Sequence, residues 1–234
     1  MAFADTVPFC HRFNLKELSY LRKILVGLIV LMGFVYIFLI PEEPVGMKIA
    51  MKLVPMMLII LYGFLADSPV SPLYKRTILA GLVVSMIADG VIYWFMAGLA
   101  TFFVAHLLYI QAFRKERRKP VPVFVAIPLI LYGLFMAVWI AGSQLAAGEI
   151  VLGVAIITYI GVILIMGWEA IRTRFPLAIT GAFLFICSDS FLAIDRFVIP
   201  LPARDALVMI TYYAAQVFLA VSIRSQFKRS TNLS

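Results

Sequence analysis

The stretch FLFICSDSFLAIDRF (183–197) places Asp189 after six almost entirely apolar residues. The apolar segment around it is long enough to cross a membrane as a helix, which takes roughly 17–25 residues. A carboxylate at that depth has no water to solvate it, and a charge at the centre of a membrane helix costs about 2.5–3.5 kcal/mol on insertion scales. Residues of this kind usually face the interior of a helix bundle and indicate a functional site.

The composition indicates a membrane protein. Of the 234 residues, 64% are hydrophobic and 14% are charged, and the mean hydropathy is +1.04. A soluble domain of this size needs more polar surface than this composition supplies. We therefore expect an all-α polytopic membrane protein, a single domain over residues 1–234 with eight transmembrane helices. The apolar runs that predict them lie at about 24–40, 47–66, 77–94, 95–113, 120–141, 149–171, 175–199 and 204–224.

The basic residues predict the topology of these spans. Most of the 20 lysines and arginines fall in segments that eight spans place on one side of the membrane, namely 12–23, 75–76, 114–119, 172–174 and 224–229. Because positively charged loops stay in the cytoplasm, the N- and C-termini are predicted to be cytoplasmic. The net charge of +8 then reflects topology and attraction to anionic lipids. Basic residues spread over several loops form no nucleic-acid surface, so no nucleic-acid partner is expected.

Most sequence motifs of soluble enzymes are absent. The chain has no G-x-S-x-G elbow, no H-E-x-x-H, no P-loop and no G-x-G-x-x-G. Two histidines are too few for a histidine-based zinc site. Cys10 and Cys187 lie far apart in the sequence and predict no disulfide framework. The first 23 residues are too polar for a signal peptide, so we expect the first span to insert directly.

Asp89, His106, Lys52 and Asp189 are ionisable residues within the predicted spans, and Asp195 and Arg196 lie near the outer end of the seventh span. At about 1.5 Å per residue, Asp89 and Asp189 lie somewhat beyond the middle of the membrane, counted from the cytoplasm. Lys52, His106 and the segment TYYAAQ (211–216) reach the same level from the opposite side. The polar groups therefore converge on one level, as a buried site requires.

Structural explanations exist for several of these groups. His106 could be a satisfied hydrogen-bonding residue between helices, and Lys52 could extend to the outer surface of the membrane. Arg196 and Arg204 could be solvated loop charges. Two aspartates at similar depth are harder to explain in this way.

A weak internal similarity relates the two aspartate spans. Asp89 is followed by a span containing HLLYIQAF (106–113), and Asp189 by a span containing TYYAAQVF (211–218). A four-plus-four duplication would make the halves parallel repeats about an axis along the membrane normal. Asp89 and Asp189 would then face each other near that axis.

Five stretches of the sequence resemble one family, the YhhN-type lysoplasmalogenases. They are GAFLFICSDSFLAIDRF (181–197), PLPARDALVMITYYAAQ (200–216), AHLLYIQAF (105–113), IADG (87–90) and KLVP (52–55). The resemblance covers most of the chain from about residue 47 and is most specific over 181–216. Members of the family hydrolyse the vinyl ether of lysoplasmalogens to a fatty aldehyde and glycerophosphoethanolamine or glycerophosphocholine. One departure is Ala88 before Asp89, where the family usually has glycine.

A pair of buried aspartates suits this reaction. Protonation of the outer alkene carbon produces an oxocarbenium ion, to which water adds. As in glycoside hydrolysis, the reaction needs one carboxylic acid and one carboxylate. An aspartate with its ordinary pKa of about 3.9 has lost its proton at neutral pH, but burial and a second nearby carboxylate favour one retained proton. We predict that Asp89 and Asp189 are the catalytic residues and share one proton.

The remaining polar residues at this level are predicted to bind the substrate. Lys52 or Arg196 would lie near the phosphate, and the single alkyl chain would lie between apolar helices. The full predicted set is Lys52, His106, Tyr109, Ser188, Arg196, Tyr212, Tyr213 and Gln216. The expected partners are a lysoplasmalogen, water and membrane lipids, and we expect no metal and no cofactor.

Two other functions fit the same residues. The carboxylates could carry protons in a transporter of lipids or small solutes, or the protein could be a non-catalytic lipid-binding scaffold. The expected location is a membrane in each case, either a bacterial inner membrane or a eukaryotic endomembrane such as the endoplasmic reticulum.

Overall fold

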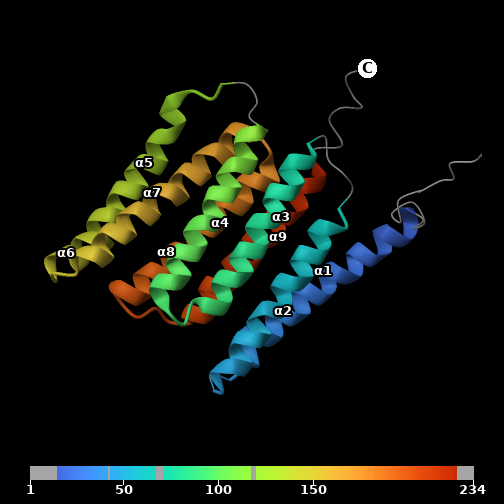
Figure 1. The fold of residues 1–234 in the computed structure, drawn as a ribbon, viewed down its shortest axis with the longest axis horizontal. Coiled ribbons are helices and arrows are strands. Elements are labelled where there is room, and N and C mark those ends of the chain that lie inside the picture. Colours follow the sequence, from blue (N-terminus) through green and yellow to red (C-terminus); the bar gives the residue numbers. More distant parts are fainter. Residues whose placement is uncertain (1–14, 42, 67–70, 117–119, 226–234) are drawn as a thin grey trace, which may run out of the picture.

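The apolar runs fold as helices throughout the part of the chain that the computed structural model describes, residues 15–41, 43–66, 71–116 and 120–225 (Figure 1). No strand occurs in those residues. The helices are α1 (Leu15–Phe38), α2 (Val45–Phe64), α3 (Pro72–Val91), α4 (Phe95–Lys115), α5 (Ile127–Met136), α6 (Gly142–Ala146), α7 (Ile150–Thr173), α8 (Pro176–Phe197) and α9 (Arg204–Ser225). A 3-10 helix, η2 (Val123–Ala126), precedes α5, and a π-helix, η3 (Ala137–Ala141), joins α5 to α6.

Local sequence signals set several of the helix ends. Ser71 caps the N-terminus of α3, where its hydroxyl accepts a hydrogen bond from the Tyr74 amide at 3.3 Å. Pro72 and Pro176 occupy the first positions of α3 and α8, where the missing N–H costs nothing. α7 ends at Thr173, because the next residue, Arg174, has a left-handed φ of 57°.

Two helical hairpins form the middle of the bundle. α3 packs along α4, α8 packs along α9, and α9 also contacts α1, α2 and α3. α1 and α2 flank the hairpins at one end, while α7 and the α5–α6 segment flank them at the other (Figure 1). α9 therefore lies at the centre, and it has the largest buried share of the candidate spans, 56%.

Seven helical segments are long and apolar enough to cross a membrane, which confirms the prediction of an all-α polytopic membrane protein. They are Glu17–Phe38, Val45–Phe64, Phe95–Lys115, Val123–Ala146, Ile150–Thr173, Pro176–Phe197 and Arg204–Arg224. α3 is not among them. It has the same length as α2, 20 residues, but Lys75, Arg76 and Asp89 lower its hydropathy. The third predicted span, 77–94, and with it the total of eight spans, thus stays a prediction.

The predicted position of the termini stays a prediction as well. Several of the basic residues on which it depends, among them Arg12, Lys228 and Arg229, lie outside the described residues.

The fifth predicted span, 120–141, differs from a regular helix. It comprises η2, α5, the π-helix η3 and α6, and it extends to Ala146. Periodicity and composition did not indicate the π-helix, because one extra residue in a turn leaves the apolar character of the segment unchanged. Met136, Ile140 and Ala141 form a small separate core there with Ile156 of α7.

Small residues allow the closest helix contacts in the central hairpins. A Cβ atom added at Gly81 of α3 would lie 2.4 Å from Cε1 of Tyr109 of α4. The Tyr109 ring is fully buried, and its hydroxyl is hydrogen-bonded to Gln216 and Ser85. The ring therefore has little freedom to move away.

We expect Gly81→Ala to destabilise the protein by about 1–3 kcal/mol, the usual cost of overpacking a core. Gly161→Ala in α7 is the matched control, because nothing lies within 4 Å of its added Cβ. Both changes gain the same helix propensity, about 1 kcal/mol, so the difference isolates the clash. Thermal unfolding of the purified variants in detergent measures it. Equal melting temperatures would show that α3 and α4 do not pack as described.

Candidate active site

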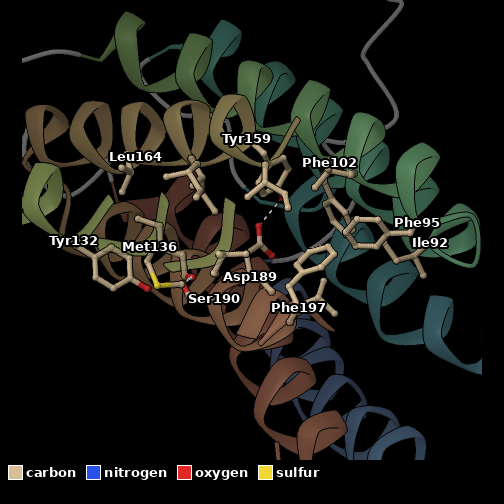
Figure 2. A pocket seen from close by; sticks show the side chains of 18 residues that line it. Ile92, Phe95, Phe102, Tyr132, Met136, Tyr159, Leu164, Asp189, Ser190 and Phe197 are labelled. Atoms are coloured by element: carbon tan, nitrogen blue, oxygen red, sulfur yellow. Dashed lines mark hydrogen bonds between the residues drawn. The ribbon is translucent and has the colours of Figure 1, made fainter. Parts of the chain in front are cut away.

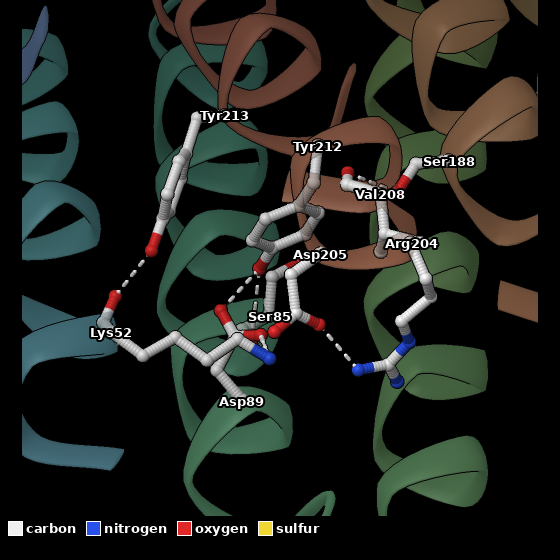
Figure 3. A network of polar contacts seen from close by, with 9 residues as sticks. All are labelled: Lys52, Ser85, Asp89, Ser188, Arg204, Asp205, Val208, Tyr212 and Tyr213. Atoms are coloured by element: carbon white, nitrogen blue, oxygen red, sulfur yellow. Dashed lines mark hydrogen bonds and ion pairs between the residues drawn. The ribbon is translucent and has the colours of Figure 1, made fainter. Parts of the chain in front are cut away.

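Asp89 is almost completely buried, 1% exposed, and has two direct side-chain partners (Figure 3). Lys52 Nζ of α2 lies 2.9 Å from Oδ1 of Asp89. The hydroxyl of Tyr212 in α9 donates to Oδ2 at 2.6 Å. Side chains of α2, α3 and the distant α9 therefore meet at this carboxylate. The direct contact with an ammonium favours the ionised form of Asp89.

Lys52 is positioned by its backbone as well as by its charge. The hydroxyl of Tyr213 donates to the carbonyl of Lys52 at 2.9 Å, as Figure 3 shows. The Lys52 side chain points inward to Asp89 and is only 14% exposed. The alternative in which Lys52 extends to the outer membrane surface does not match this arrangement.

A second group of hydrogen bonds lies one helical turn away from Asp89. Ser85, one turn earlier in α3, lies with its Oγ 3.2 Å from the Tyr109 hydroxyl, which donates to Gln216 Oε1 at 2.9 Å. All three side chains are buried. Tyr109 and Gln216, predicted to bind substrate, thus contact each other, and their role in binding stays a prediction.

Asp189 has different partners. The hydroxyl of Tyr159 in α7 donates to Oδ2 of Asp189 at 2.5 Å, and Nε2 of His106 in α4 lies 3.8 Å from the same oxygen. The His106 ring packs edge-on against Phe185 and Tyr159, with centroid distances of 4.7 and 5.3 Å. Among the described residues, no lysine or arginine forms an ion pair with Asp189.

Tyr159 was missed by the sequence analysis. It is the only tyrosine of an otherwise strongly apolar span, within IITYIG (156–161). A phenol inside such a span needs a hydrogen-bonding partner, and this requirement could have identified Tyr159 as a candidate site residue. The sequence alone did not indicate which partner it has.

Two cavities meet at Asp189. The first, of about 310 Å³, is here called the polar cavity, and its lining includes both Asp89 and Asp189. Its ionisable residues are Lys48, Lys52, Asp89, Asp189, Arg196, Arg204 and Asp205, with Tyr36, Tyr93 and Tyr212. Both predicted catalytic carboxylates therefore face the same space.

The second cavity, of about 70 Å³, is here called the apolar cavity (Figure 2). It lies among α4, α5, η3, α7 and α8, and most of its lining is aliphatic or aromatic. Ile92, Phe95, Phe102, Asp189 and Leu192 line both cavities. The hydroxyls of Tyr132 and Ser190, 2.5 Å apart, link α5 to α8 beside the apolar cavity.

Arg196 differs from the other cations of the polar cavity. Lys48 and Arg204 both bind Asp205, at 3.0 and 2.6 Å. Arg196 stacks over the ring of Phe95 with 4.8 Å to the ring centroid, and it has no carboxylate partner in the described part of the chain. Arg196 and Arg204 thus both line the cavity, unlike the solvated loop charges considered from sequence.

The other predicted binding residues have structural contacts. Ser188 lines the polar cavity, and its hydroxyl donates to the Val208 carbonyl at 3.0 Å. Tyr213 and His106 line neither cavity. Among the described residues, no group of three or more histidine, cysteine, aspartate or glutamate side chains could hold a metal ion.

An all-helical membrane bundle with two aspartates at a common cavity, Asp89 buried and Asp189 15% exposed, defines the class of protein. The chain belongs to the YhhN family, whose model matches residues 47–223, and the resemblance found in the sequence is thereby confirmed. It is 33% identical over 175 residues to lysoplasmalogenase TMEM86A of Bos taurus, covering 68% of each chain. It is also 33% identical over 187 residues to lysoplasmalogenase TMEM86B of Homo sapiens, covering 78% of each. No solved structure matches the chain.

The ion pair between Lys52 and Asp89 generates a prediction about stability. Lys52→Met leaves the Asp89 carboxylate buried without its cation, which typically costs about 3–5 kcal/mol. Adding Asp89→Asn removes the unpaired charge, so the double variant should be more stable than Lys52→Met alone. Melting temperatures of the three variants in detergent measure the coupling. Additive losses in the double variant would contradict a direct pair.

Proposed function

We propose that the protein is a lysoplasmalogenase that hydrolyses the vinyl ether bond of a single-chain ether phospholipid. The products are a fatty aldehyde and glycerophosphoethanolamine or glycerophosphocholine. One observation carries the proposal: Asp189 lies where a charged cavity meets an apolar one. A lysoplasmalogen has the same division, since its vinyl ether joins a polar glycerophospho headgroup to an alkenyl chain. The family membership and the names of the relatives support the same activity.

The different partners of the two aspartates support different roles. Lys52 stabilises Asp89 as a carboxylate, whereas the hydrogen-bonding partner of Asp189 is the neutral Tyr159. A buried carboxyl group without a cation favours its protonated form. We therefore assign the single proton predicted for the pair to Asp189, the acid, and the charge to Asp89.

The reaction then proceeds with a complete proton balance. Asp189 transfers its proton to the outer alkene carbon, and the ether oxygen shares the resulting positive charge as an oxocarbenium ion. The carboxylate of Asp89, which lines the same cavity, stabilises this cation. Water adds to the oxocarbenium carbon and returns one proton to Asp189. The hemiacetal loses its hydroxyl proton as the glycerol oxygen gains one, and it separates into aldehyde and alcohol.

Arg196 is the proposed anchor for the phosphate. Lys52, considered first from the sequence, is already held by Asp89, while Lys48 and Arg204 are held by Asp205. Arg196 lines the polar cavity without a carboxylate partner among the described residues, and its guanidinium presents paired donors to a phosphate. The alkenyl chain would lie toward the apolar cavity.

We expect the purified protein in detergent to release aldehyde from lysoplasmalogen. Asp89→Asn and Asp189→Asn should each lower kcat by at least about a hundredfold, within the usual range for loss of a general acid or base. Glu149→Gln, a carboxyl-to-amide change at an exposed position, is the control. A transporter would show no turnover without a sealed compartment, and near wild-type turnover in either aspartate variant would exclude the two-carboxylate proposal.

Isotopes test the chemical step with the same protein. In heavy water the aldehyde should carry deuterium on the carbon next to its carbonyl, because that carbon receives the proton. With ¹⁸O-labelled water the label should enter the aldehyde, which must be trapped rapidly, and not the glycerol alcohol. Label in the alcohol would mean attack at the glycerol carbon, and the assignment of Asp189 as acid would be wrong.

The anchor role of Arg196 predicts a change in KM. Arg196→Ala should raise KM about tenfold or more and leave kcat within about threefold, since a phosphate contact is made equally in ground and transition states. Arg174→Ala removes the same charge outside both cavities and should leave KM unchanged. An unchanged KM in Arg196→Ala, or a collapse of kcat at saturating substrate, would remove Arg196 from this role.

A further inference from the structure

His106 is a fully buried histidine with one bonded and one unbonded ring nitrogen. Its Nδ1 lies 2.6 Å from the carbonyl oxygen of Phe102, one turn earlier in α4. Its Nε2 has no hydrogen-bond partner in the described part of the chain and lies 3.8 Å from Oδ2 of Asp189. The hydrogen-bonding role between helices considered from the sequence therefore does not explain this nitrogen.

The bond to Phe102 determines which nitrogen of His106 carries the proton. A carbonyl oxygen can only accept, so Nδ1 must be the donor. A second proton on Nε2 would create a buried imidazolium whose N–H has no acceptor at hydrogen-bonding distance, which is costly. The neutral imidazole is therefore the favoured form, and its Nε2 presents a lone pair on the side of Asp189.

A lone pair near a carboxylate oxygen disfavours the ionised form of that carboxylate. Oδ2 of Asp189 already accepts a hydrogen bond from Tyr159, and the ring of Tyr159 packs against His106. If Asp189 were ionised, its negative charge would lie beside the electron-rich Nε2 in a low-dielectric interior. If Asp189 is protonated, this repulsion is removed.

We propose that His106 is a positioning residue that keeps Asp189 protonated, so that an acid is available for transfer to carbon at neutral pH. The proposal rests on the proposed function and deepens it. His106 lines neither cavity, so it acts through Asp189 and does not contact the substrate. After Asp189 has donated its proton, the same repulsion would make its carboxylate a better base for the proton of the attacking water.

Other ionisable groups surround this pair from each neighbouring element. Tyr159 approaches from α7, and the Asp89 carboxylate of α3 with its Lys52 partner of α2 shares the polar cavity with Asp189. The remaining ionisable residues of that cavity are Lys48, Arg196, Arg204, Asp205, Tyr36, Tyr93 and Tyr212. Of all these groups, only Tyr159 forms a hydrogen bond with Asp189 within the described residues.

The first test uses the protein without substrate. The chain has two histidines, so ¹⁵N-histidine NMR of a His11→Gln variant reports His106 alone. We expect a neutral ring protonated on Nδ1 at neutral pH. Infrared spectroscopy with ¹³C-aspartate should show a protonated carboxyl band that Asp189→Asn removes. An imidazolium signal, or the absence of that band, would overturn the proposal.

The second test uses the pH dependence of turnover. His106→Asn can retain the donor to Phe102, because the asparagine amide corresponds to Nδ1, but it lacks the Nε2 lone pair. Asp189 then ionises more easily, so the alkaline limb of the kcat profile should move to lower pH by about one unit, a loss of about tenfold on that limb. On the acid side kcat should stay within about threefold.

A purely structural role for His106 predicts a different result. It would lower kcat equally at every pH and leave the alkaline limb of the kcat profile at the same pH. This outcome overturns the proposal, as does a shift of the alkaline limb to higher pH. Thr101→Val, a change at a partly exposed position of the same helix that lines neither cavity, is the control and should not move the limb. If His106→Asn does not fold, the spectra of the protein with His106 in place decide. Absence of aldehyde release would refute the proposed function. The protonation states of His106 and Asp189 would still be decided by the spectra, because those need no substrate.

Discussion

A carboxylate inside the hydrocarbon layer must find all its partners within the protein, because the surrounding lipid offers no hydrogen bonds. Much of the helix arrangement follows from this constraint. Asp89 draws on Lys52 of α2 and Tyr212 of α9, and Asp189 draws on Tyr159 of α7 with His106 of α4 nearby. Six helices thus contribute to the two carboxylates. Each aspartate approaches the return helix of the other central hairpin, as a duplicated hairpin would arrange them, although the repeat itself stays a prediction.

The two aspartates are chemically unequal because their partners are unequal. An ammonium 2.9 Å from Asp89 favours a carboxylate, while a phenol and an imidazole beside Asp189 provide no fixed positive charge. A reaction that needs one acid and one carboxylate requires this difference. Under the proposed function, the asymmetry turns two similar residues into a proton donor and a cation stabiliser.

The position of Asp189 between two cavities relates this chemistry to the shape of a lipid. Charged side chains gather on the side of Arg196 and Asp205, and aliphatic side chains gather among α5, α7 and α8. Under the proposed function, an amphipathic molecule would satisfy both sides only in one orientation, which would bring its central bond to the carboxyl group. The proposed selectivity for a single-chain ether lipid therefore depends on where the cavities join, more than on any one residue.

The sequence by itself determined the class of the fold and the family, and it predicted a buried site around Asp89 and Asp189. Long apolar runs allow only membrane helices, and isolated charges within them, such as Asp89 and Asp189, mark the buried layer because they are costly there. It could not determine partners. Tyr159 was missed, the contact between Lys52 and Asp89 was not predicted, and the π-helix was not foreseen, since which side chains meet depends on helix rotation and packing. Only the tertiary structure decided that Lys52 pairs with Asp89 and leaves Asp189 without a cation, because this pairing joins residues on separate helices.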